Sequence, residues 1–164
     1  MHSANISPIA RDTKGKGGIV MVENDTVKLL RECDAGIKMG VAAIDDVMSH
    51  VHGEEFRKSL NACRDEHENL RVQVREMLSS CGDDGKEPNP MAKGMSWIKT
   101  NVMLAADGSD ATVADLITDG CNMGVKSLNR YLNQYAAADE KAKTVAKKLI
   151  RLEEKLTQSA GAYL

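Results

Sequence analysis

Residues 34–41 read Asp-Ala-Gly-Ile-Lys-Met-Gly-Val, and residues 118–125, 84 positions later, read Thr-Asp-Gly-Cys-Asn-Met-Gly-Val. The similarity extends along both flanks. Alternate steps of four and three residues through the first copy select Val27, Leu30, Asp34, Ile37, Val41, Ile44, Met48 and Val51. The same steps through the second copy select Ala111, Ala114, Thr118, Cys121, Val125, Leu128, Leu132 and Tyr135. Mostly apolar sets at this spacing are typical of amphipathic helices, so the pattern predicts two similar helical halves.

Periodicity and capping residues predict four long helices and a shorter one. We expect the long helices at about residues 24–51, 54–81, 110–136 and 139–160, and the shorter one at residues 91–105. Asn24 or Asp25 would cap the first helix, and Gly53 would close it in a left-handed conformation. Each half is then an antiparallel hairpin, and the long link between the halves contains the short helix. We therefore predict an all-α, ferritin-like four-helix bundle, which has this connectivity.

Residues 1–20 differ from the rest of the chain, because they are rich in Gly, Ser and small polar residues and show no periodicity. Two interpretations remain open. The segment is a disordered tail, or it is upstream sequence read through, with Met21 as the biological start. Residues 21–164 form the single predicted domain, since this length suits one hydrophobic core.

Composition excludes several classes of function. The net charge of −2 and the lack of a block of basic residues argue against nucleic acid and membrane surfaces as partners. Four cysteines at wide spacing contain no Cys-x-x-Cys pair, so they form neither a zinc knuckle nor a redox motif. No charged-then-apolar leader is present, and we expect a cytoplasmic protein with reduced thiols.

The chain resembles a bacterial ferritin-like family of unknown function. The resemblance covers roughly residues 25–158 and is carried by the repeated Asp-Ala-Gly and Asp-Gly segments, by a short crossover helix that contains Trp97, and by Tyr131. It implies a four-helix bundle without an established activity. Family members typically have a Glu beside the repeated Gly, and here Ile37 and Cys121 stand at or near those places.

Candidate metal ligands are few. A diiron centre needs a Glu from each of two helices and a Glu-x-x-His from each of the other two, and the inward stripes here offer only Asp34, His67 and Thr118 as polar residues. One interpretation is a buried hydrogen bond between Asp34 and His67, joined by Thr118, that sets the register of the bundle. The other is a mononuclear iron, manganese or zinc site of Asp34, His67 and Cys63.

Four glycines interrupt the repeated helices: Gly36, Gly40, Gly120 and Gly124. Each costs about 1 kcal/mol relative to Ala inside a helix, so we expect close helix–helix packing to offset this cost. The packing would join the two halves or form a dimer contact.

We therefore expect a non-enzymatic bundle that acts by self-association, as a homo-oligomer such as a dimer, or by binding a partner protein. The sequence shows no nucleophile–base–orienter set, phosphate loop or nucleotide fingerprint, and it indicates no catalytic residue or cofactor. The alternative is a metal-binding protein of oxidative stress that uses Asp34, His67 and a nearby cysteine.

Overall fold

The computed structural model describes residues 14–164, with the side chains of residues 25–90 and 99–164. Over this range the chain forms five helices and no strand, so the predicted all-α class is confirmed. The helices are α1 (Lys14–Met48), α2 (Glu54–Ser80), α3 (Pro90–Ala106), α4 (Asp110–Gln134) and α5 (Glu140–Gly161). None of the helices in this part of the chain has the length and apolar character needed to cross a bilayer.

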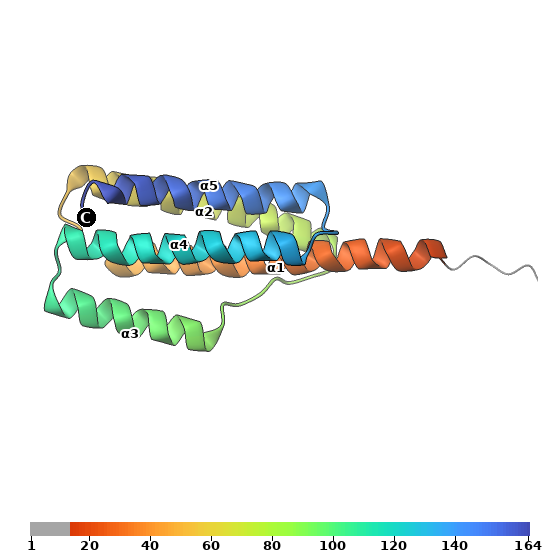
Figure 1. Cartoon of the computed structure of the whole chain (residues 1–164), viewed down its shortest axis with the longest axis horizontal. Coiled ribbons are helices and arrows are strands. Elements are labelled where there is room, and N and C mark those ends of the chain that lie inside the picture. The colour runs from red at the N-terminus through yellow and green to blue at the C-terminus, as the bar shows by residue number, and fades with distance from the viewer. Residues whose placement is uncertain (1–13) are drawn as a thin grey trace, which may run out of the picture.

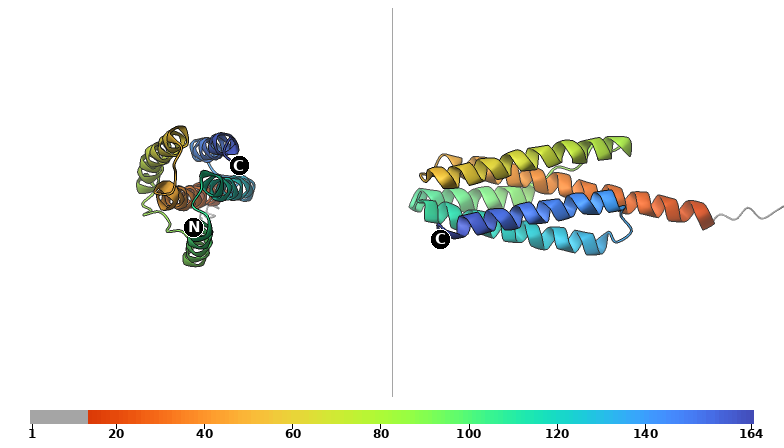
Figure 2. Two further views of the ribbon diagram at one scale, coloured as in Figure 1. Left: turned by 90° about the vertical axis from the view of Figure 1, so that its left-hand side faces the viewer. Right: turned by 90° about the horizontal axis from the view of Figure 1, so that it is seen from above.

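Four long helices lie side by side, and the shorter α3 lies outside them (Figures 1 and 2). α1 packs along α2 and α4 packs along α5, while contacts of α1 with α4 and α5, and of α2 with α5, join the two hairpins. α3 contacts α1 and α4. The interior is filled by aliphatic side chains and by Phe56, with three buried cysteines, which agrees with the low aromatic content.

The start of the first helix was predicted wrongly. α1 begins at Lys14, ten residues before Asn24, and its N-terminal part projects beyond the other helices (Figure 1). Asp25 and Thr26 do not cap it. Their side-chain oxygens accept hydrogen bonds from the backbone N–H groups of Ala137 (3.1 Å) and Asp139 (2.8 Å), in the turn between α4 and α5. Of the predicted segment 1–20, residues 14–20 belong to α1 and residues 1–13 lie outside the described residues.

Gly53 does not close α1 in a left-handed conformation. It caps the start of α2 with an extended backbone, at φ −68° and ψ 123°. The N–H groups of His52 and Gly53 each donate to the carboxylate of Asp110, at 2.7 Å, and these bonds lower the pKa of Asp110. A Cβ at position 53 would lie 2.8 Å from Asp110 Oδ2. A side chain at position 53 would therefore displace the carboxylate of Asp110, the first residue of α4.

The Gly53→Ala variant should lose about 1–3 kcal/mol of unfolding free energy, because the added methyl group displaces the Asp110 carboxylate from two N–H donors. Urea denaturation measures this loss. Gly161→Ala is the matched control: no atom lies within 4 Å of a Cβ built there, so it should not lose stability. Equal effects of the two substitutions would contradict this role of Gly53.

Candidate functional site

A buried ion pair joins the two hairpins in the middle of the bundle. His67 on α2 is 1% exposed, and its Nε2 lies 3.0 Å from Oε1 of Glu153 on α5. The Glu153 side chain is 12% exposed. The opposite ring nitrogen, Nδ1, lies 2.9 Å from the carbonyl oxygen of Cys63 and 3.5 Å from its Sγ. Both nitrogens of the imidazole are therefore engaged.

His67 and Glu153 lie at the same distance in sequence from the first residues of their helices. His67 follows Glu54, the first residue of α2, by 13 residues, and Glu153 follows Glu140, the first residue of α5, by the same number. The ion pair therefore connects the two hairpins at the same depth in each.

The hydrogen-bond partners of His67 determine its protonation state. The carbonyl of Cys63 and the carboxylate of Glu153 are both acceptors, so each ring nitrogen must carry a proton. The ring is then a charged imidazolium. Burial alone would lower the pKa of His67, but hydrogen bonds with Cys63 and Glu153, together with the charge of Glu153, raise it to about 10.

Two of the repeated glycines border this pair. A Cβ on Gly40 would lie 2.7 Å from His67 Nε2, so the ring lies directly against the backbone of α1. A Cβ on Gly124 would lie 3.5 Å from Cδ of Glu153, which is an ordinary van der Waals distance. Gly36 and Gly120 are exposed, with no atom within 4 Å of a Cβ built there. The predicted close packing is thus absent within the chain at these two positions.

Cys121 on α4 borders the same carboxylate. Its burial, and the charge of Glu153 and a hydrogen bond with it, raise the pKa of this thiol. Cys63 and Cys121 nevertheless cannot form a disulfide in this arrangement. No Cα atom of α2 lies within 8 Å of one of α4, and a disulfide needs a separation below about 7 Å.

Asp34 lies in a different environment. Its Oδ2 accepts from the Lys38 side chain at 2.8 Å and from the backbone N–H of Lys86 at 3.0 Å, while its buried Oδ1 has no partner. Lys86 belongs to the loop between α2 and α3. Gly85 in this loop has φ +89°, and a Cβ there would overlap the Asp34 carboxylate.

Asp34 is also far from His67 along α1. The His67 ring lies against Gly40, and Asp34 precedes Gly40 by six residues, which is about 9 Å along a helix. The predicted Asp34–His67 hydrogen bond is therefore wrong.

Further ion pairs hold this loop along α1. The pairs are Arg31–Asp83, Lys86–Glu32 and Lys38–Glu87. Thr118, which was expected to join Asp34 and His67, has a buried hydroxyl without a hydrogen-bond partner.

Of the three predicted metal ligands, the structure brings together Cys63 and His67, and Asp34 lies apart from them. Among residues 25–90 and 99–164, no three Cys, His, Asp or Glu side chains are arranged to hold a metal ion. The polar groups at the centre of the bundle bind one another instead.

Sequence reasoning missed Glu153. The apolar stripe of the fourth long helix contains no polar residue, and Glu153 has no His at a useful spacing on its own helix. Its partner lies on the other hairpin. The repeat offset of 84 residues pairs His67 with Arg151 and not with Glu153, so the repeat does not reveal this partner either.

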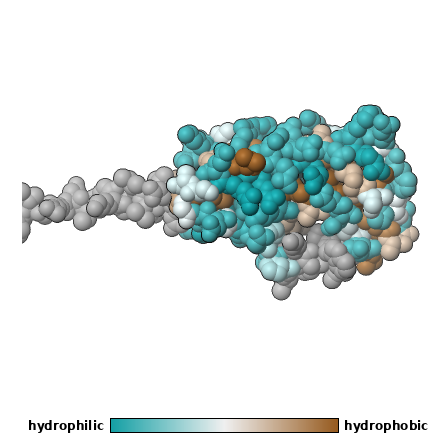
Figure 3. Space-filling view, turned by 180° about the vertical axis from the view of Figure 1, so that it is seen from behind, coloured by the Kyte–Doolittle hydropathy of each residue, from teal (hydrophilic) through white to brown (hydrophobic). Residues whose placement is uncertain are grey.

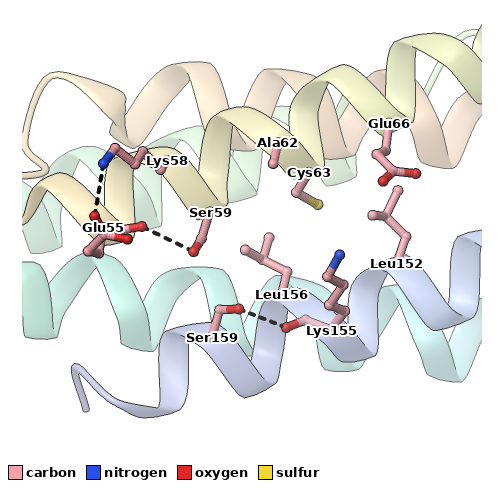
Figure 4. Close-up of a pocket in the computed structure, with 10 residues that line it drawn as sticks. All are labelled: Glu55, Lys58, Ser59, Ala62, Cys63, Glu66, Leu152, Lys155, Leu156 and Ser159. Carbon is pink, nitrogen blue, oxygen red and sulfur yellow. Dashed lines mark hydrogen bonds and ion pairs between the residues drawn. The ribbon is translucent and has the colours of Figure 1, made fainter.

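A shallow groove between α2 and α5 leads to this cluster. Its lining includes Cys63, Leu152 and Leu156, with charged side chains at its rim (Figure 4). The face of the molecule seen from behind is mostly hydrophilic, with separate small apolar patches (Figure 3).

No protein-family model matches the chain, and no curated protein or solved structure matches it.

The ion pair should make stability depend on pH in one direction. Since the pKa of His67 is raised in the folded state to about 10, its contribution is complete below the unfolded value of about 6.5 and is lost as the pH rises toward 10. The difference in unfolding free energy between the natural protein and His67→Gln should therefore be a few kcal/mol near pH 6 and shrink above about pH 7. If the difference in unfolding free energy between the two proteins stays constant from pH 6 to pH 10, His67 and Glu153 do not form the ion pair.

Gly40→Ala should destabilise the protein by about 1–3 kcal/mol, because the new methyl group pushes the His67 ring away from Glu153. Thermal unfolding compares it with Gly161→Ala, which meets open space at the end of α5 and should not lower the melting temperature. Stabilisation by both substitutions would show that the ring does not lie against α1.

Proposed function

We propose that this protein is a non-enzymatic, ferritin-like bundle that acts by protein association, with a second copy of itself as the partner. The observation that carries the proposal is the state of His67. Both of its ring nitrogens are used, by Cys63 and by a carboxylate of the other hairpin, at the centre of the bundle, where ferritin-like proteins place their metal ligands. The central imidazole thus serves the packing of the helices.

The order of the helices supports the ferritin-like assignment. α1 and α2 form one hairpin, α4 and α5 form the other, and the long connection between them contains α3 (Figure 1). One long crossover between two hairpins is the arrangement of ferritin-like folds.

Two exposed glycines, one on α1 and one on α4, support association. Gly36 and Gly120 lie at equivalent repeat positions on these two packed helices, and both are exposed. In an isolated chain each lowers helix stability by about 1 kcal/mol relative to Ala. Met123, one turn from Gly120, is 66% exposed, and methionine is frequent on association surfaces. Close approach of a second copy over these glycines would offset their cost.

Light scattering tests this proposal. At about 100 µM, a dimer with a dissociation constant of about 1 µM is almost fully formed. The protein should then have twice the chain mass of 17.8 kDa. The double variant Gly36→Gln and Gly120→Gln should be monomeric and equally well folded, whereas Gly161→Gln, a control at an exposed glycine of α5, should remain dimeric. A monomeric natural protein would contradict the proposal, and so would stoichiometric iron, manganese or zinc in protein purified without chelators.

A further inference from the structure

The groove between α2 and α5 continues past Cys63 along both helices. It consists of two adjoining hollows, which share Glu66, Leu152 and Lys155 as lining residues. The second hollow extends the groove as far as Lys148 on α5. Leucine side chains line both hollows, together with polar and charged ones. The two helices therefore form one continuous open groove of mixed apolar and polar character.

The α5 side of this groove is positively charged. Lys148, Arg151 and Lys155 line it, and their spacings of three and four residues place them on one flank of the helix. All three residues are exposed. The row from Lys148 to Lys155 is about 10 Å long, at 1.5 Å per residue. In Figure 4 the Lys155 side chain lies between the two helices and points toward α2.

These three cations are available to a ligand. The ion pairs found within residues 25–90 and 99–164 involve other lysines and arginines. Lys58, by contrast, lines the other end of the groove and pairs with Glu55 at 2.9 Å (Figure 4). Four basic and two acidic side chains line the groove, which gives it a net charge of +2 on a chain of net charge −2. The groove is therefore complementary to an anionic ligand.

The α2 side determines which kind of anion fits. Asn69 and Gln73 present amides, which donate as well as accept hydrogen bonds, and Glu66 presents a carboxylate. Leu70 and Leu152 add apolar surface to the same hollow. A nucleic acid strand would bring its phosphates close to the carboxylate of Glu66. An amphipathic helix suits the groove better, because its carboxylates face α5 while its apolar side chains contact the leucines.

We propose that the α2–α5 groove binds an acidic amphipathic helix of a partner protein, whose carboxylates pair with Lys148, Arg151 and Lys155. Carboxylates three, four or seven residues apart on such a helix match the spacing of these cations, because both helices have the same rise per residue. The inference does not rest on the proposed association of two copies, since Gly36 and Gly120 lie on α1 and α4. The mass of the protein tests that association, and peptide binding tests this groove.

Fluorescence anisotropy of a labelled peptide tests the proposal. The probe is a helical peptide of Ala, Leu and Glu, with glutamates at helical spacing beside a stripe of leucines, and its control has Gln in place of every Glu. At low ionic strength the Glu peptide should bind the natural protein with a dissociation constant of about 100 µM or below, and the Gln peptide at least about tenfold more weakly. No binding of the Glu peptide, or equal binding of both peptides, would overturn the proposal.

Charge-reversed variants locate the binding. The double variant Lys148→Glu and Lys155→Glu should weaken binding of the Glu peptide at least about tenfold, because two attractive contacts become repulsive. The control Lys126→Glu and Lys147→Glu changes the net charge equally, at exposed lysines that do not line the groove, and should weaken binding less than about threefold. All four side chains are exposed, so both double variants should keep the helical circular dichroism of the natural protein. Equal losses of affinity in the two double variants would refute the groove as the binding site.

A single-stranded oligonucleotide separates an acidic helix from a chain of phosphates. Labelled oligothymidylate should bind the natural protein at least about tenfold more weakly than the Glu peptide at the same ionic strength, because Glu66 repels phosphates in the groove. If the oligonucleotide binds as tightly as the peptide, the groove does not select an acidic helix, and the proposal fails.

Discussion

A charged imidazole and a carboxylate, at the same depth in α2 and α5, hold the two hairpins in register. Burial of each charge costs several kcal/mol, so the pair is stable only if its remaining hydrogen bonds are also satisfied. The structure meets this requirement: Nδ1 of His67 bonds to the Cys63 carbonyl, and Gly40 leaves the ring room beside α1. A slip of either hairpin along the bundle axis would leave a charge unpaired in the interior. The pair therefore selects one arrangement among the many that aliphatic stripes alone would allow.

Two polar clusters outside this pair complete the bundle. Asp110 accepts the backbone N–H groups of the α1–α2 turn, and Asp34 binds the backbone of the α2–α3 loop. Both carboxylates connect segments that are distant in sequence, and in both cases a glycine permits the approach. Polar groups inside the molecule thus serve its architecture. Other molecules can reach the exposed glycines Gly36 and Gly120, and the groove between α2 and α5 that Cys63 lines.

The local sequence pattern predicts most of the helices, but it does not predict which side chains pair with one another. The apolar stripes and the caps at Ser109 and Asp139 place α4 and α5 correctly, because each cap accepts from an N–H in its own first turn. The cap roles predicted for Gly53 and Asp25 were wrong, because their hydrogen-bond partners lie more than 50 residues away in sequence. A fold of the first hairpin about Gly53 places His67 opposite position 39 of α1, and in the structure the ring lies against Gly40. Its partner Glu153 could not be found in this way, because the rotation of one hairpin relative to the other is not encoded in either hairpin alone.

The protonation state of His67 tests the central claim most directly. Nitrogen-detected NMR of the protein labelled with ¹⁵N in its imidazole rings distinguishes a doubly protonated ring from either neutral tautomer. The account predicts that near pH 8 the His67 ring carries a proton on both nitrogens, while in Glu153→Gln it has lost one of them. A neutral His67 ring at that pH in the natural protein would show that no ion pair joins the two hairpins.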